Sequence, residues 1–204
     1  MRLSAAAKNV MLDALDESQA AGAKFASLHS AYSATGTNEL TGGSPAYARK
    51  AATWNNAAAG AKAINGTIVF DVAAAAVVRF VGFWDAVTAG NFLGMSPNAG
   101  TIPQAFVVPD ATADVLECVA HGFVNTETVV VWAVPGDPLP TGLVEGTVYF
   151  VINATTDDLQ LSATSGGAAV AITAIGAGML QKLVVETFGG QGTHTITACT
   201  MSLD

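Results

Sequence analysis

Apolar and polar residues alternate in short runs along most of the chain, with the period of a strand that has one buried face. Clusters of Gly, Pro, Asn and Ser separate these runs about every 8–12 residues, a rhythm typical of antiparallel sandwiches and barrels. One of the turns, Asn65-Gly66, predicts a hairpin. The expected strands span residues 24–32, 46–54, 67–72, 77–84, 92–95, 104–108, 115–120, 126–134, 148–153, 159–162, 168–172, 179–184 and 194–203.

The start of the chain has helical instead of strand periodicity. Ser4 is the expected N-cap of a helix over about residues 4–20, and Gly22 lies past its end. The apolar face of this helix should pack against a sheet or against a neighbouring subunit. A membrane surface is disfavoured, because the polar face has more acidic than basic residues. The apolar face consists of Leu3, Ala7, Val10, Met11, Ala14 and Leu15.

Acidic residues are concentrated in the middle of the chain. The whole sequence has a net charge of −8, and residues 104–183 hold eight acids against the single base Lys182, a local charge of −7. We interpret this segment as a small acidic β-module inserted into a discontinuous domain of residues 1–103 and 184–204, since a folded insert brings its own ends together. The acidity argues against nucleic acid as a partner, because phosphate binding needs a basic surface.

Composition and termini narrow the class of protein further. With 51% hydrophobic and 12% charged residues, the chain is far from the disordered class. No run approaches the about 18–20 apolar residues of a membrane span, and Lys8 and Asp13 interrupt any signal-like segment, so we expect synthesis in the cytoplasm. Cys118 and Cys199 lack a short spacing; two reduced, buried thiols are the favoured interpretation, and a long-range disulfide between them stays open.

No group of residues has the spacing of a reaction centre. His29, His121 and His194 are far apart in sequence, without the short spacing of a zinc site. The acids of the central segment form no calcium loop and lack the aromatic neighbours that would stack on a sugar ring in a glycosidase. A nucleophile elbow, a P-loop and a dinucleotide fingerprint are also missing from the sequence. We therefore expect no enzymatic activity, no metal and no cofactor.

The stretch of residues 38–54 offers three side chains as candidates for a subunit interface. A Thr-Gly-Gly-Ser-Pro turn at residues 41–45 precedes an alternating run with three large side chains. Tyr47, Arg49 and Trp54 are candidates for a subunit interface, because aromatic residues and arginine are enriched there. They are equally consistent with core aromatics beside an arginine that buries its aliphatic part.

Several segments occur in an order that resembles one group of phage proteins. They include residues 3–15, 26–30 and 37–50, Val-Gly-Phe-Trp-Asp at 81–85 and Gly-Thr-His-Thr-Ile-Thr at 192–197. In this order they resemble small virion proteins of tailed phages of actinobacteria, commonly labelled minor tail or tail-fibre-like proteins. The resemblance covers residues 1–103 and 184–204. Within the central segment, residues 120–125, 139–143, 148–153 and 159–167 resemble an exchangeable β-module of phage tail and fibre proteins.

The resemblance implies a structural protein of the virion, made in the cytoplasm of the bacterial host. The expected fold is mostly β, an antiparallel β-sandwich or jelly-roll-like host domain with an N-terminal helix and a small inserted β-domain. The main expectation is a minor tail, tail-tip or fibre-like protein. It is expected to form a homotrimer, to bind other virion proteins, and to contact a glycan or receptor on the host cell surface. A capsid decoration protein or head fibre is the alternative, and a carbohydrate-binding module or glycan hydrolase is a third.

Overall fold

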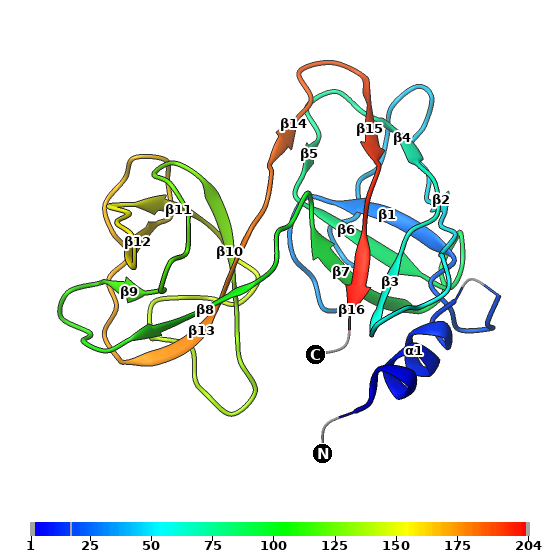
Figure 1. Ribbon diagram of the computed structural model, residues 1–204. Coiled ribbons are helices and arrows are strands. Elements are labelled where there is room, and N and C mark those ends of the chain that lie inside the picture. Colours follow the sequence, from blue (N-terminus) through cyan, green and yellow to red (C-terminus); the bar gives the residue numbers. More distant parts are fainter. Residues whose placement is uncertain (1–2, 17, 203–204) are drawn as a thin grey trace. The chain divides into compact units, whose positions relative to one another are not determined.

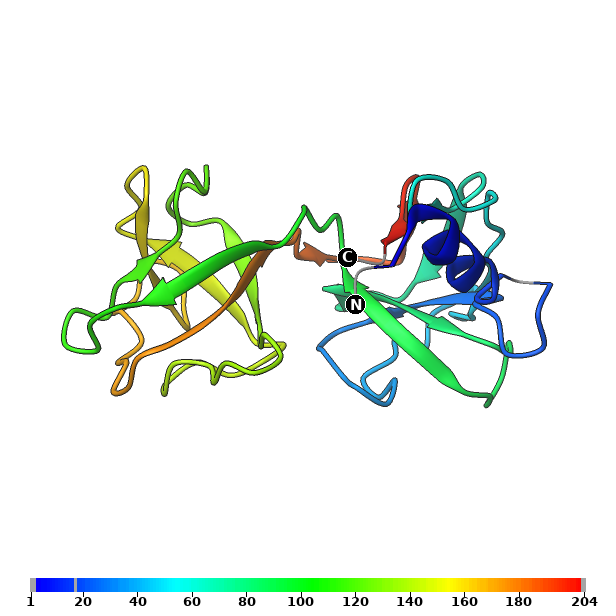
Figure 2. The same cartoon turned by 60° about the horizontal axis from the view of Figure 1, so that its bottom comes forward.

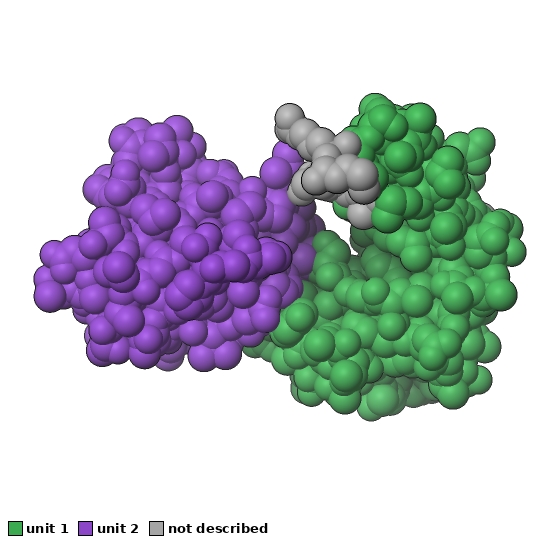
Figure 3. Space-filling view, turned by 90° about the horizontal axis from the view of Figure 1, so that it is seen from below, with its two compact units in different colours: residues 1–96, 186–204 green, residues 97–185 purple. Residues whose placement is uncertain are grey.

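The computed structural model describes residues 3–16 and 18–202 and consists mostly of antiparallel β-structure (Figure 1). By its internal contacts the chain forms two compact units, which Figure 3 shows in different colours. Unit 1 contains residues 1–96 and 186–204, and unit 2 contains residues 97–185. The predicted fold class, mostly β and antiparallel with one N-terminal helix, is confirmed.

Unit 1 is organised around a four-stranded sheet that is covered on both faces. Its strand order is β2-β1-β6-β7, where β1 is Phe25–His29, β2 is Lys50–Ala51, β6 is Phe80–Trp84 and β7 is Phe92–Pro97. One face, with Ala26, Leu28 and Phe83, packs into the apolar core. Every residue of β6 is buried, which explains why this strand is apolar along its whole length instead of alternating.

The C-terminal segment of the chain completes unit 1 by pairing with strands from its first half. β4 (Ile68–Val72) pairs with β15 (Gly192–Ile196), β3 (Ala61–Ala63) with β16 (Thr200–Ser202), and β5 (Val77–Val78) with β14 (Glu186–Thr187). Along β15, His194 and Ile196 are buried, while Thr193 and Thr195, which alternate with them, are exposed. The core therefore contains residues from both ends of the chain, including Phe70, Phe188 and Ile196.

Unit 2 is a closed antiparallel barrel with the strand order β10-β11-β12-β9-β8-β13 (Figure 2). Alternate residues point inward, such as Val129 and Val131 from β10 and Leu159 and Leu161 from β12, and together they fill the barrel. Closure leaves no unpaired edge between the first and last strands. The strands are β8 (Gln104–Val108), β9 (Leu116–Glu117), β10 (Thr128–Trp132), β11 (Val148–Ile152), β12 (Asp158–Ser162) and β13 (Gly176–Lys182).

The two ends of unit 2 lie side by side. Asn98 and Val184 exchange two hydrogen bonds: the Val184 amide donates to the Asn98 carbonyl at 2.8 Å, and the Asn98 side chain donates to the Val184 carbonyl at 3.0 Å. The Thr101 amide also donates to the carbonyl of Lys182 at 3.2 Å. These contacts draw residues 97–103 into unit 2.

The N-terminal helix, α1 (Ala5–Asp13), is shorter than the expected span of residues 4–20. Its start is as predicted, because the Ser4 hydroxyl accepts a hydrogen bond from the Ala7 amide at 3.2 Å. After Asp13 the chain continues in tight turns, in which the Leu15 amide bonds to Leu12 and the Asp16 amide to Asp13. At this end of the helix, the side chains of Asp13 and Asp16 both bind Lys62, which fixes the turn to β3 (Ala61–Ala63).

Three predicted strand features are wrong, and distant partners explain two of the differences. Residues 46–54 form a strand only at Lys50–Ala51, with an isolated bridge from Trp54 to Ile64, and the turn of residues 43–46 takes up the start of the expected strand. The Asn65-Gly66 turn joins β3 to β4, but these strands pair with β16 and β15 instead of with each other. Residues 168–172 form only an isolated bridge, and the Ile172 amide donates to the Asp114 carboxylate at 2.6 Å.

We predict that replacing residues 97–185 by a short Gly-Ser linker leaves unit 1 folded, because the ends of unit 2 are adjacent and the strand pairs of unit 1 stay complete. Amide NMR spectra of the shortened chain should retain the dispersed signals of unit 1. As a control, removal of residues 186–204 should unfold unit 1, since it deletes the partners of β3, β4 and β5. A shortened chain that is unfolded would contradict the division into two units.

Candidate functional site

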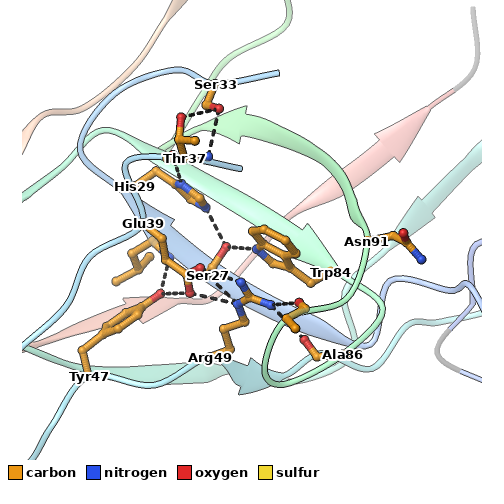
Figure 4. A network of polar contacts seen from close by, with 12 residues as sticks. Ser27, His29, Ser33, Thr37, Glu39, Tyr47, Arg49, Trp84, Ala86 and Asn91 are labelled. Carbon is orange, nitrogen blue, oxygen red and sulfur yellow. Dashed lines mark hydrogen bonds and ion pairs between the residues drawn. The ribbon is translucent and has the colours of Figure 1, made fainter. Parts of the chain in front are cut away.

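The face of the central sheet that points away from the apolar core carries a buried polar network (Figure 4). Ser27 and His29 lie on the same face of β1, and their side chains are 0% exposed. Ser27 pairs with Gly82 of β6. A Cβ atom at Gly82 would lie 2.5 Å from His29 Nε2 and 2.7 Å from Ser27 Oγ, so only glycine leaves room for both polar side chains.

The hydrogen bonds of His29 define its protonation. Its Nδ1 lies 2.9 Å from the carbonyl oxygen of Thr37 and must donate to it, which makes Nε2 the acceptor. Ser27 Oγ, at 2.7 Å, therefore donates to Nε2, and it accepts a hydrogen bond from Trp84 Nε1 at 2.9 Å. Burial lowers the pKa of His29 below its ordinary value of 6.5, although the bond to Thr37 works in the opposite direction.

A serine that donates to a histidine is also the arrangement of a nucleophile with its general base. Here the pair has a different role, because both side chains are fully buried and the serine oxygen is occupied by the indole of Trp84. A substrate would have to displace the packed loop to reach it. The pair instead fastens the loop of residues 30–40 to the sheet, together with the bond from the Leu40 amide to the Leu28 carbonyl at 2.9 Å.

Arg49 connects the loop to the sheet by ionic and aromatic contacts. Its guanidinium donates to both carboxylate oxygens of Glu39 at 2.8–3.1 Å and to the carbonyls of Ala86 and Ala89 at 3.1 and 2.7 Å. It also stacks over the ring of Trp84, with its central carbon 3.5 Å from the ring centroid (Figure 4). This planar, multiply bonded geometry requires arginine and not lysine.

The three candidate interface residues lie within unit 1. The hydroxyl of Tyr47 accepts from the Leu28 amide at 2.8 Å and donates to Glu39, and burial raises the pKa of this tyrosine. Trp54 is 5% exposed in the apolar core, where its indole donates to the Ala23 carbonyl at 2.8 Å. Arg49 and Tyr47 thus share the contact with Glu39, while Trp54 packs elsewhere. Their role in a subunit interface stays a prediction.

The other residues considered for chemistry have local structural contacts. His121 Nδ1 accepts from the Phe123 amide at 2.8 Å, and His194 Nδ1 lies 2.5 Å from a carboxylate oxygen of Glu186. The carboxylate of Asp110 binds its neighbour Thr112 in a turn, and this hydrogen bonding lowers its pKa. Within residues 3–16 and 18–202, no three His, Cys, Asp or Glu side chains gather in a group that could hold a metal ion.

The two cysteines are both free thiols and belong to different units. Cys118 is buried in the barrel, and Cys199 is half-buried in unit 1. Burial raises the pKa of Cys199 to about 11, which keeps it a neutral thiol at physiological pH.

None of the helices in the described part of the chain is long and apolar enough to span a membrane.

Residues 2–102 match the model of a family described as podophage GP4 fiber I protein gp80. The matched segment contains α1, β1–β7 and every residue of the Ser27, His29 and Arg49 contacts described above. Searches of curated proteins and of solved structures gave no significant match.

This match, which covers just under half of the chain, supports a class of protein only at a coarse level. It supports a structural, fibre-like role in a tailed bacteriophage, and hence a place among the components of the virion. The polar network fits such a role, because its donors and acceptors are used to hold one loop rigidly to the sheet.

We predict that Arg49→Lys lowers the free energy of unfolding of unit 1 by about 2 kcal/mol, since lysine cannot keep the bidentate contact and the stacking on Trp84 together. Chemical denaturation measures the change. Arg79→Lys is the matched control, because among the described residues the guanidinium of Arg79 makes one hydrogen bond, to the Ser30 carbonyl at 2.8 Å. If both variants lowered the free energy of unfolding by the same amount, the bidentate and stacking contacts of Arg49 would not stabilise unit 1 more than the single hydrogen bond of Arg79 does.

His29 should make the protein less stable in mild acid. Its pKa is lowered in the folded state, so the unfolded chain takes up a proton first as the pH falls below about 6.5. The stabilising effect of the neutral ring is complete above that pH and decreases below it, by at most about 1.4 kcal/mol per pH unit. Denaturation between pH 5 and 6.5 should show this slope, and His29→Gln should flatten it. An unchanged slope in the variant would refute the assignment.

Proposed function

We propose that this chain is a minor tail or tail-tip protein of a tailed phage, which assembles as a homotrimer on other virion proteins. The observation on which this depends is the match of residues 2–102 to a phage fibre family. The resemblance of the chain ends to minor tail proteins of actinobacterial phages supports the more specific location. Assembly into the particle is then the work of unit 1, which contains the matched segment.

Unit 2 is, in this proposal, an inserted module that contacts the host cell surface. Its support is architectural: the module is a closed barrel, its two ends are adjacent, and it enters unit 1 between β7 and β14. It also holds most of the negative charge of the chain, −7 of −8. A surface glycan or protein receptor is the proposed ligand, and exposed loops between barrel strands are the usual place for such contacts.

The proposed role is structural and not enzymatic. The one pair that resembles a catalytic arrangement, Ser27 with His29, is fully buried and bonded to Trp84. The acidic side chains of Asp110, Asp114 and Asp157 accept hydrogen bonds from backbone amides in turns. These contacts give the carboxylates a conformational role.

Cryo-EM of the intact particle, with copy numbers from quantitative mass spectrometry, tests the proposal. We expect the chain as three copies, or a small multiple of three, at the tail tip or in a tail fibre. Density spread over the capsid shell in many copies would instead identify a decoration protein or head fibre. Absence from purified particles, combined with glycan binding or turnover by the free protein, would contradict a virion role altogether.

A further inference from the structure

The Asn65-Gly66 turn lies open to solvent and is not the tip of a hairpin. The strands on either side of it, β3 and β4, pair with β16 and β15, so they form no ladder that would hold the turn between them. Both residues are exposed, and a Cβ atom at Gly66 would have no heavy atom within 4 Å. The φ of Gly66 is +87°, a conformation that glycine adopts at little cost.

Thr53 holds the backbone of Asn65 but not the two groups of the turn that can react with each other. The Asn65 amide donates to the Thr53 carbonyl at 2.7 Å, and the Thr53 hydroxyl donates to the Asn65 carbonyl at 2.9 Å. Among the described residues, the side-chain amide of Asn65 and the backbone amide of Gly66 make no hydrogen bond. A carboxamide and the nitrogen that follows it in the chain are therefore both free.

The other asparagines of the chain are more constrained. Asn56 is the one whose side chain also lacks a hydrogen bond among the described residues, but the amide that follows it, on Ala57, donates to the Asp13 carboxylate at 3.0 Å. Within the described residues, Asn65 alone combines a free carboxamide with a free amide after it. The asparagines with a side-chain hydrogen bond are Asn9, Asn38, Asn55, Asn91, Asn98, Asn125 and Asn153.

We propose that Asn65 is a site of spontaneous deamidation, with water as the co-reactant. The Gly66 nitrogen loses its proton to the solvent and attacks Cγ of Asn65, which closes a five-membered succinimide ring, and the side-chain nitrogen leaves as ammonia. Glycine permits this attack because no Cβ crowds the nitrogen. Water then adds to one of the two ring carbonyls. Addition at Cγ breaks the new bond and gives aspartate, whereas addition at the main-chain carbonyl breaks the original peptide bond and gives isoaspartate.

The modified chain keeps the strand pairs of unit 1. Either product adds one negative charge to the −8 of the chain, and isoaspartate also lengthens the backbone of the turn by one methylene group. Because β3 and β4 are held by different partners, a longer connection between them shifts no shared register. This inference is independent of the proposed function.

Ageing of the full chain in mildly alkaline buffer tests the site, with mass spectrometry of a digest to locate each aspartate and isoaspartate. A synthetic peptide of residues 61–70 is the unfolded reference. We expect Asn65 of the folded chain to react within about tenfold of the peptide rate, and at least about tenfold faster than any other asparagine. The rate should rise with pH, since the Gly66 nitrogen attacks after losing its proton. Circular dichroism of the aged chain should match that of the fresh chain.

Two substitutions serve as controls. Asn65→Gln keeps a carboxamide but would have to close a six-membered ring, so position 65 should stay unmodified. Asn56→Gln should leave the rate at Asn65 unchanged, because that residue belongs to a different turn.

A folded chain in which Asn65 lags the peptide by more than about tenfold would overturn the proposal, because the fold would then protect the turn. Equally fast conversion at Asn56 or at a hydrogen-bonded asparagine would also overturn it, since the free groups at Asn65 and Gly66 would then give no selectivity. Loss of the folded signal on ageing would refute the claim that the strand pairs survive. None of these results bears on the homotrimer or on the location in the particle.

Discussion

Unit 1 depends on strand pairs formed between residues more than a hundred positions apart. β4 and β15 share five residue pairs, from Ile68 with Ile196 to Val72 with Gly192, and β3 and β5 have their partners in the same C-terminal segment. Without that segment the backbone groups of β4 would lose their hydrogen bonds, and Phe70 would lose its cover. The hydrogen bonds between Asn98 and Val184 reduce the cost of closing such a long loop, because they hold the two ends of unit 2 together.

The central sheet buries two chemically different faces. One contributes apolar side chains to a core shared with the C-terminal strands, while the other holds Ser27 and His29 under a loop that Arg49 fastens. A buried polar network of this kind stabilises only when each donor and acceptor has a partner, and then it selects a single arrangement of the loop. Rigidity of the matched segment is consistent with a protein whose task is to hold its place in a particle.

The sequence pattern predicted correctly those strands and helix ends that depend on neighbouring residues. It predicted wrongly the strand pairing that depends on residues far away in the chain. Strands such as β8 and β11 follow directly from their alternation, and the N-cap of α1 follows from Ser4. The Asn65-Gly66 hairpin failed because β15 and β16 take the edges that β3 and β4 would have used. Lys62, which binds Asp13 and Asp16 at the end of α1, is an ordinary surface residue by its sequence context. Its burial could not be seen before the fold was known.

The polar network had a weaker signal in the sequence. Ser27 and His29 are two residues apart in an apolar strand, which places them on the same face of the sheet. The loop that covers them and the space that Gly82 leaves for their side chains depend on the tertiary structure and cannot be read from the sequence. Of the three candidate residues, Arg49 and Tyr47 turned out to share Glu39, a partner that no spacing rule would have selected. Trp54 lies apart from them in the core.

Native-state hydrogen exchange can show whether the C-terminal segment is an integral part of unit 1, because it measures the opening free energy of each strand in the intact chain. The structure predicts that amides of β4 and β15 open together, with one shared free energy, as a unit separate from the barrel amides of β10 and β11. If the amides of β15 exchanged at a much lower free energy than those of β4, the C-terminal segment would be only an accessory to unit 1, and the dependence of unit 1 on it would be refuted.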